Sequence, residues 1–238
     1  MKLLSLETSA VAASCCVTDG DNILSQAAVN AGLTHSRTLM PMVEAALAFA
    51  DLTPADVEAV AVAVGPGSFT GIRIGVATAK GLAFPADLPC VAVSTLEAMA
   101  YRLSGLPLCG RVCAVMDARC KQVYTATFLI ENGTLTRETP DEAIAIDDLF
   151  ARLKTADTPV YLIGDGAAMC YDLGKDVLPQ LTLLPAQLRL QDAVGVAAVA
   201  AKKLAAGDTV KGEALLPTYL RLPQAERELK AKQDTQNG

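Results

Sequence analysis

One stretch decides the fold: Gly65-Pro66-Gly67-Ser68-Phe69-Thr70-Gly71-Ile72-Arg73-Ile74-Gly75. It follows a run of six apolar residues, 59–64, which is typical of a strand buried on both faces. A segment of helical period comes after it, and its glycines let the backbone turn sharply between the two. The stretch therefore predicts a strand, a tight loop and a helix. Loop N–H groups at such a helix start favour an anion such as phosphate.

The known nucleotide-binding motifs are nevertheless absent from this loop. A Walker loop needs Lys-Ser or Lys-Thr after its last glycine, whereas Gly71 is followed by Ile72-Arg73. A dinucleotide fingerprint needs glycine where this chain has Thr70. Instead Gly71, Gly75 and Ala79 recur at intervals of four and give the helix a face of small residues. That face predicts close contact with another helix, either of this chain or of a partner.

Composition narrows the classes of function. The chain has 238 residues, a formal net charge of −6, no tryptophan and 4% aromatic residues, so contact with nucleic acid is expected only through a more basic partner. The seven cysteines include no C-x-x-C pair, which predicts reduced thiols and no metal site. Polar residues interrupt the N-terminus too early for a signal peptide, so a cytoplasmic protein is expected. No apolar run is long enough for a membrane span. The 52% hydrophobic content predicts an alanine- and valine-rich core, or an exposed apolar docking patch.

The periodicity predicts the same order of elements twice. In the first half, strands are expected near residues 3–7, 12–18, 23–29, 59–64 and 89–93, with helices over 35–50, after the glycine loop and over 95–103. In the second half, strands are expected near 111–116, 123–130, 134–138 and 160–163, with a helix over 147–154. A last strand (181–184) and helix (191–206) follow. Two βββαβα units indicate a duplicated α/β fold of the actin-like ATPase (ribonuclease H-like, ASKHA) plan, with a mixed sheet in each of two subdomains. The expected divisions are an N-terminal subdomain (1–104), a C-terminal subdomain (105–223) and a flexible charged tail (224–238).

Several motifs carry a resemblance to a known family. They are Leu6-Glu7-Thr8-Ser9, His35-Ser36-Arg37, the glycine stretch, Val93-Ser94-Thr95-Leu96, Asp117-Ala118-Arg119 and Pro217-Thr218-Tyr219-Leu220-Arg221. On these residues the chain resembles the TsaB (YeaZ) family, the non-catalytic subunits of the bacterial machinery that makes threonylcarbamoyladenosine in tRNA. The likeness extends from residue 1 to about 223 and is looser in the second half.

The resemblance implies a scaffold role in the cytoplasm. Such a subunit pairs with its catalytic paralogue TsaD, is joined by the ATPase TsaE, and forms a homodimer when isolated. It has no cofactor of its own, and ATP or ADP and a metal would be bound by the partner subunits. The expected docking surface comes from the helices over 39–47 and 71–82: Leu39, Met40, Val43, Leu47, Gly71, Arg73, Ile74, Gly75, Thr78, Ala79 and Leu82. Because the helix dipole disfavours a cation in the first turn, Arg73 is expected to pair with a carboxylate.

The turns that hold phosphates in the actin-like plan look degenerate. The first, Glu7-Thr8-Ser9, has no glycine, and the second, Asp117-Ala118-Arg119, keeps the aspartate but lacks the glycine after it. Gly164-Asp165-Gly166 stands where an adenosine loop would be. Asp117 and Arg119 are therefore expected beside a nucleotide: either Arg119 reaches a phosphate held mainly by a partner, or it pairs with Asp117.

Two other functions remain open from the residues. One is an autonomous ATPase or small-molecule kinase of the same fold, and the other is a glycoprotease-like peptidase. His35 is the only histidine, so the chain has neither a histidine pair for a catalytic metal nor a Ser-His-Asp triad with independent support. No residue of this chain is therefore expected to be catalytic.

Overall fold

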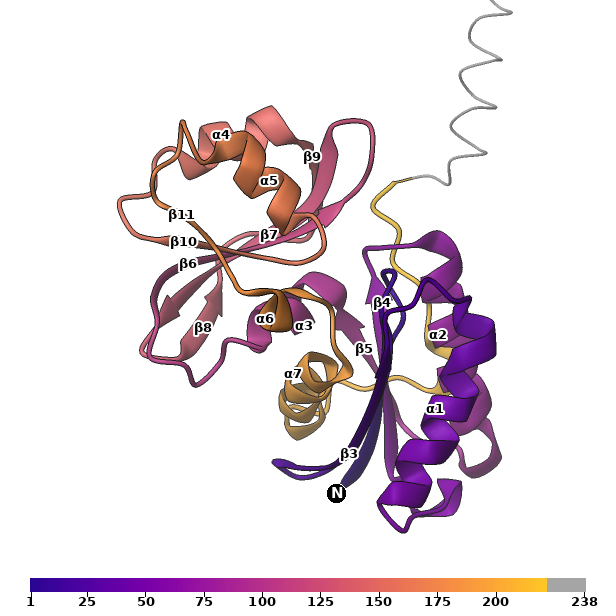
Figure 1. Ribbon diagram of the computed structural model, residues 1–238. Coiled ribbons are helices and arrows are strands. Elements are labelled where there is room, and N and C mark those ends of the chain that lie inside the picture. Colours follow the sequence, from indigo (N-terminus) through magenta and orange to yellow (C-terminus); the bar gives the residue numbers. More distant parts are fainter. Residues whose placement is uncertain (222–238) are drawn as a thin grey trace, which may run out of the picture.

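The computed structural model describes residues 1–221 as two α/β halves (Figure 1). The expected charged tail, 224–238, lies outside the described residues. The halves are built on separate sheets of five and six strands. Helix α3 (Thr95–Tyr101) lies where they meet, with Ala98 in a core cluster of the first half and Leu96 and Met99 in one of the second.

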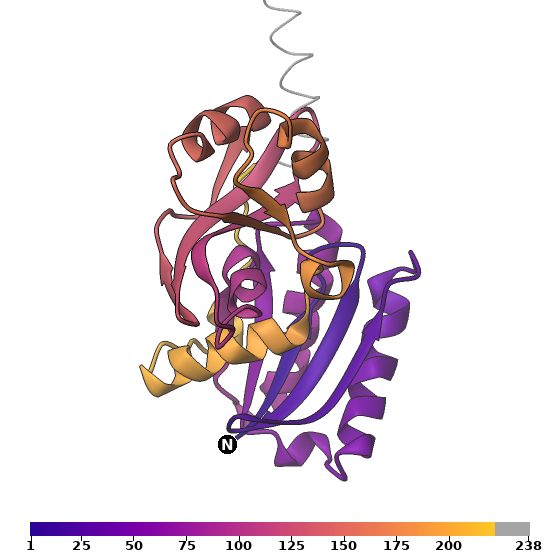
Figure 2. The same ribbon diagram turned by 60° about the vertical axis from the view of Figure 1, so that its left-hand side comes forward.

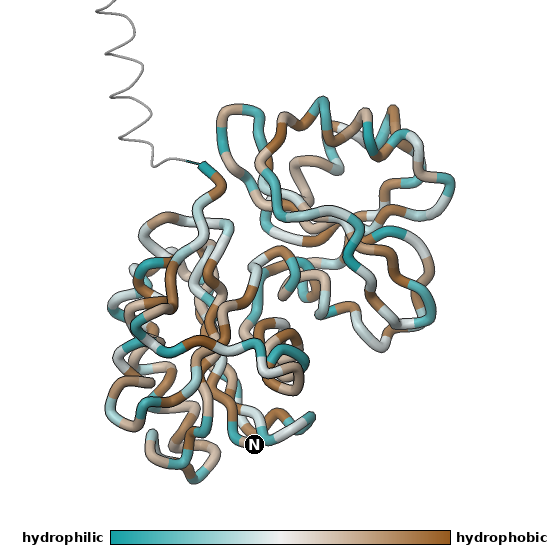
Figure 3. The backbone as a smooth tube through the Cα atoms, turned by 180° about the vertical axis from the view of Figure 1, so that it is seen from behind, coloured by the Kyte–Doolittle hydropathy of each residue, from teal (hydrophilic) through white to brown (hydrophobic). Residues whose placement is uncertain are grey.

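The first sheet has the expected strands in the order β3-β2-β1-β4-β5. Strands β1 (Lys2–Glu7), β2 (Ala13–Asp19) and β3 (Asn22–Val29) form an antiparallel meander, whereas β4 (Ala59–Gly65) and β5 (Cys90–Ser94) run parallel to β1. Every residue of β4 is buried, as the apolar run predicts. Hydrophobic stretches accordingly run through the interior of this half in Figure 3.

Helices cover both faces of the first sheet. Helices α1 (His35–Phe49) and α2 (Phe69–Ala83) share one core cluster with the sheet, and α1 continues through Pro41. Helix α7 (Ala193–Ala205) covers the opposite face. There it also packs closely against α3. At Gly195 the two helices are so close that an added Cβ would overlap with the Ala98 carbonyl oxygen. The close approach of two helices at a small residue therefore occurs between α7 and α3.

The second sheet repeats the plan with one additional strand. Its order is β11-β10-β6-β7-β8, with β9 pairing β7. The strands are β6 (Cys109–Asp117), β7 (Gln122–Glu131), β8 (Thr134–Arg137), β9 (Glu142–Ala145), β10 (Val160–Ile163) and β11 (Leu181–Leu183). Helices α4 (Ile146–Leu153) and α5 (Ala167–Gly174) cover one face and α3 lies on the other. Strand β9 was not predicted, since it is short and its residues are only half-buried.

The chain returns to the first half at its end. The short helix α6 (Ala186–Arg189) leads back, and α7 lies across the first sheet in Figure 2. Further along the chain, Leu215 is fully buried in the core cluster that α1 and α2 share with this sheet. Short 3-10 turns η1 (Pro54–Asp56), η2 (Phe84–Ala86) and η3 (Gly212–Ala214) complete the description. Residues 105–223, expected to form one subdomain, therefore do not form one packed body. None of the helices within residues 1–221 combines the length and apolarity that a membrane crossing needs.

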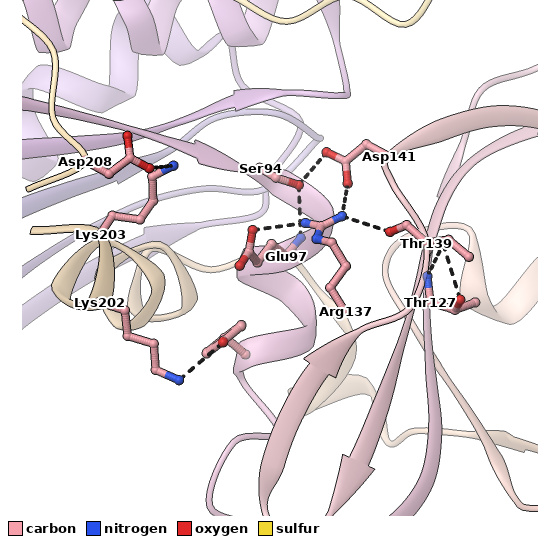
Figure 4. A network of polar contacts seen from close by, with 10 residues as sticks. Ser94, Glu97, Thr127, Arg137, Thr139, Asp141, Lys202, Lys203 and Asp208 are labelled. Carbon is pink, nitrogen blue, oxygen red and sulfur yellow. Dashed lines mark hydrogen bonds and ion pairs between the residues drawn. The ribbon is translucent and has the colours of Figure 1, made fainter. Parts of the chain in front are cut away.

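A polar network joins the halves beside α3 (Figure 4). The guanidinium of Arg137 donates to Asp141 (2.7 Å) and to Glu97 (3.0 Å), and it lies over the Phe128 ring. Ser94, the N-cap of α3, donates to the same Asp141 carboxylate (2.6 Å). Arg137 thus ties the start of α3 to the β8–β9 region of the second half.

We expect Arg137→Ala to lower the free energy of unfolding by about 1–3 kcal/mol, because it leaves two half-buried carboxylates without their shared donor. Arg152→Ala is the matched control. Arg152 pairs with Glu142 at the surface, so its loss should cost at most about 1 kcal/mol. Urea denaturation of both variants measures the difference, and equal effects would show that the Arg137 network does not stabilise the junction.

Candidate functional site

The small-residue face of α2 is filled by this chain itself. A Cβ on Gly71 would overlap with the Thr8 carbonyl oxygen, and a Cβ on Gly75 with Thr8 Oγ1. Thr8 Oγ1 also donates a hydrogen bond to the Gly71 carbonyl oxygen (2.9 Å). The turn after β1 therefore occupies this face, with His35 at the start of α1 also close to Gly71. The prediction that Gly71, Gly75 and Ala79 lie at a partner interface was wrong.

The same correction applies to the apolar positions of α1. Leu39, Val43 and Leu47 are buried in the core of the first half, because they lie at the spacing that points toward the sheet. Of the other expected interface residues, Met40 and Arg73 are exposed, and Ile74, Thr78 and Leu82 are half-buried. The expected set thus mixed residues from two opposite sides of the helices.

The accessible side of these helices has its own apolar residues. We define the outer α1/α2 face by its exposed residues: Met40, Glu44, Ala48 and Phe49 on α1, and Arg73, Ala77, Gly81 and Phe84 along and just after α2. Phe49 is 80% exposed, Phe84 86% and Met40 38%. Sequence reasoning missed both phenylalanines, although each ends a helix at a position outside the core spacing. Met40, Phe49 and Phe84 are thus the large apolar side chains that α1 and the end of α2 expose to solvent.

Arg73 does not pair with a carboxylate among the residues that the structure describes. Its guanidinium lies 3.8 Å from the centre of the Phe69 ring, and its Nε donates to the Tyr219 hydroxyl (2.8 Å). The two rings are themselves in contact, with centres 4.8 Å apart. A cation–π contact and a phenol thus replace the expected ion pair. This stack joins the first turn of α2 to the last described residues of the chain.

A cleft of about 560 Å³ opens between the halves. Its walls come from the turn after β1, the 66–70 loop, the β6–β7 turn, Tyr124, Asp165 and the segment 218–221. The last of these, which we call the terminal strap, joins both halves. The Thr218 N–H donates to the Val64 carbonyl (2.8 Å), and the Arg221 guanidinium donates to the Ala118 carbonyl. The cleft contains Asp117 and Arg119, so the structure brings the two together in its wall.

Each of the two turns binds a carboxylate of its own. The Ser9 N–H donates to Glu7 Oε1 (2.6 Å), and the Arg119 N–H donates to Asp117 Oδ1 (2.7 Å). In each case the carboxylate ends a central strand and accepts from the residue two positions later. These N–H groups are thereby unavailable to a phosphate. The expected alternative of an Arg119–Asp117 ion pair is replaced by this backbone contact.

Burial changes the proton affinity of two carboxylates near the cleft. Glu7 is fully buried, and loss of hydration raises its pKa to about 7 despite the Ser9 hydrogen bonds. Asp165 is exposed to the cleft, and partial desolvation by the surrounding protein atoms raises its pKa too. Gln191 donates to Asp165 (3.0 Å). Burial therefore disfavours the ionised form of both carboxylates.

Outside the cleft, the described residues include few groups suited to catalysis or metal binding. His35 Nε2 lies 2.7 Å from the Ala10 carbonyl oxygen, and this hydrogen bond helps to hold the turn after β1 in place. Burial raises the pKa of the Cys113 thiol to about 12, which leaves it unreactive at neutral pH. Within residues 1–221, no three His, Cys, Asp or Glu side chains are grouped as metal ligands would be.

Comparison with known proteins identifies the family. The model of the family described as TsaD, tRNA N6-adenosine threonylcarbamoyltransferase, matches residues 28–229. The chain is 33% identical over 226 residues to the tRNA threonylcarbamoyladenosine biosynthesis protein TsaB of Bacillus subtilis, covering 95% of this chain and 96% of that protein. The chain belongs to the TsaB family. TsaB of Escherichia coli is 34% identical over 203 residues, 84% of this chain and 86% of that protein.

Solved structures agree with this membership of the TsaB family. A Pseudomonas aeruginosa protein, described as similar to the peptidase YeaZ, superposes with a TM-score of 0.79 at 29% identity, covering 92% of this chain and 99% of that one. The duplicated α/β fold predicted from the order of elements, with a mixed sheet in each half, is confirmed by the structure. TsaB proteins are tRNA threonylcarbamoyladenosine biosynthesis proteins, and this member shares the fold of the Pseudomonas aeruginosa protein.

Gly75→Ala should lower the free energy of unfolding by about 1–3 kcal/mol, because the added methyl forces Thr8 away from α2. Gly81→Ala is the matched control on the same helix. No atom lies within 4 Å of a Cβ at Gly81, so this variant should gain up to about 1 kcal/mol of helix propensity. Thermal and urea denaturation measure both. A neutral Gly75→Ala would contradict the contact between α2 and the turn after β1.

Glu7→Gln should change how stability depends on pH. Since the folded-state pKa of Glu7 is raised from 4.5 to about 7, the parent protein loses stability as pH rises through this window. The glutamine variant lacks this loss. The difference in free energy of unfolding between the variant and the parent should therefore shift in favour of the variant by up to about 3 kcal/mol between pH 5 and pH 8. Urea denaturation at both pH values measures it. Glu44→Gln, at an exposed position of α1, should follow the parent; a Glu7→Gln variant that did the same would overturn the assignment.

Proposed function

We propose that this chain supports the threonylcarbamoylation of tRNA as a non-catalytic subunit that docks on its catalytic paralogue TsaD. The observation that carries the proposal is the outer α1/α2 face, where Met40, Phe49 and Phe84 are exposed on a chain of the TsaB family. Apolar side chains of this size are stabilised by burial against a partner. The ATPase TsaE would join the pair.

The chemistry of the cleft supports a non-catalytic role. Both turns that would approach a nucleotide's phosphates donate instead to Glu7 and Asp117. The nucleotide and the metal that the modification requires would be bound by the partner subunits, and tRNA would be bound mainly by them as well. The proposed complex would work in the cytoplasm.

Homodimer formation would use the same face. Because paralogues share the exposed surfaces of α1 and α2, two copies of this chain can pair as this chain pairs with TsaD. A homodimer is therefore expected when the chain is isolated, and TsaD would compete with it for the outer face.

The test places a charged side chain in the middle of the outer face. Ala77→Arg should reduce co-purification with TsaD by about tenfold or more, because the exposed Ala77 would lie inside the contact. It should also shift the isolated chain from dimer to monomer in sedimentation. Ala151→Arg on α4 is the matched control at an exposed helical alanine of the second half and should change neither.

A reconstituted modification reaction completes the test. Omission of this chain should abolish tRNA modification, and Ala77→Arg should behave like omission. Retained TsaD binding by Ala77→Arg would exclude the outer face as the docking surface. Undiminished modification without the chain would exclude the supporting role itself.

A further inference from the structure

A second cavity, of about 210 Å³, lies within the second half and shares no lining residue with the cleft. It opens where α4 covers β6 and β7, and the buried side chains of Leu149 and Leu153 form its apolar side. Among the described residues, every other side chain of the lining is charged or is a threonine. Two of these threonines, Thr127 and Thr139, are hydrogen-bonded to each other in Figure 4. The core thus gives way at one end of α4 to a group of charges and hydroxyls.

Two ion pairs line this cavity. Arg111 Nε donates to Glu138 Oε2 (2.7 Å), and Arg152 Nη1 donates to Glu142 Oε1. All four side chains are partly exposed, so a molecule from solvent can reach them. The lining therefore presents two positive and two negative charges side by side and is neutral overall.

Each ion pair leaves polar atoms unused. Within residues 1–221, the two terminal nitrogens of Arg111 have no hydrogen-bond partner, and neither do Glu138 Oε1 and Glu142 Oε2. The terminal nitrogens of a guanidinium form a fork that matches the two oxygens of a carboxylate. Carboxylate oxygens in turn accept hydrogen bonds from an ammonium group. The cavity thus has room in its bonding for one carboxylate and one ammonium.

The neutral lining favours a ligand that carries both charges. A lone anion would lie beside two carboxylates, and a lone cation beside two guanidinium groups, whereas a zwitterion adds no net charge. The volume limits its size, because 210 Å³ corresponds to about seven water molecules at about 30 Å³ each in the liquid. An amino acid such as serine, with about seven non-hydrogen atoms, is of this size and has its ammonium and carboxylate on one carbon.

We propose that this cavity binds a free α-amino acid with a small side chain. The carboxylate of the ligand contacts the terminal N–H groups of Arg111, and its ammonium donates to Glu138 and Glu142. Its side chain lies against the hydroxyl of Thr125 and the apolar side of the cavity. The site uses no residue of the outer α1/α2 face, so it goes beyond the docking function and does not rest on it.

The experiment is a calorimetric titration of the isolated full chain with L-serine. We expect saturable one-to-one binding with a Kd below about 1 mM. Serinamide keeps the ammonium but lacks the carboxylate, and N-acetylserine keeps the carboxylate but lacks the ammonium. Each should bind at least about tenfold more weakly than serine. Because these compounds also mimic the two ends of a peptide, they distinguish a free amino acid from a chain terminus.

Three variants locate the bound serine. Arg111→Gln and Glu142→Gln should each weaken serine binding about tenfold or more, because each removes one of the two charge contacts. Lys154→Gln is the matched control, since Lys154 is an exposed cation directly after α4 that does not line the cavity; its effect should be less than about twofold. Circular dichroism shows which variants fold. Glu142→Gln retains an oxygen that can accept from Arg152, so it decides the outcome if Arg111→Gln does not fold.

Three results contradict this amino-acid site. They are the absence of saturable serine binding up to about 10 mM, binding of serinamide or N-acetylserine as tight as that of serine, and a loss in Glu142→Gln no larger than in Lys154→Gln. None of them affects TsaD docking, because that function is measured separately by co-purification with the Ala77→Arg variant.

Discussion

The contact between the turn after β1 and the first turns of α2 is the constraint on which the rest of the structure depends. Thr8 and Ser9 lie so close to the 65–75 stretch that a Cβ on Gly67, Gly71 or Gly75 would overlap with them. The Ser68 N–H donates to the Ser9 carbonyl (2.7 Å), so the two segments are also hydrogen-bonded. Strands β1 and β4 are neighbours in the sheet, and this seam fixes how α2 leaves β4. The direction of α2 in turn decides which of its residues reach solvent.

The turns of the two halves show how a shared plan diverges chemically. Both halves end their central strand in a carboxylate that caps the next turn, Glu7 in one and Asp117 in the other. The Glu7 carboxylate is enclosed and exchanges its proton near neutral pH, whereas Asp117 is exposed in the cleft. One turn has thus become part of the core, while the other still faces solvent with Arg119 at its tip.

Periodicity and turn chemistry were enough to predict the architecture. The buried run of β4, the neighbouring strands expected near 12–18 and 23–29 and the helix expected from residue 95 each depend on local sequence, and the structure has all of them. Strand β9 and the packing of α7 on the first sheet could not be predicted from the sequence, because both depend on contacts between segments far apart in the chain. A close contact of two helices at a small residue occurs instead at Gly195 of α7, which was not predicted.

The candidate site could be predicted only in part for the same reason. Spacing predicted the helices α1 and α2 but not which side of them faces solvent, because small residues fit equally well against a loop and against a partner. The sequence likewise gave no sign that Arg73 would meet Tyr219, which lies 146 positions away. Local dipole arguments treat a helix end in isolation, and here the aromatic ring of another segment supplies the stabilising contact.

The stack of Phe69, Arg73 and Tyr219 gives the two surfaces of this molecule a common structural element. Arg73 belongs to the outer α1/α2 face, and Phe69 and Tyr219 line the cleft. Two positions after Tyr219, Arg221 holds the turn of the second half at Ala118. A partner that covers Arg73 therefore acts on side chains that also set the position of the terminal strap. Since the strap is hydrogen-bonded to both halves, one segment of the chain connects the side chains at the start of α2 with the turn of the second half.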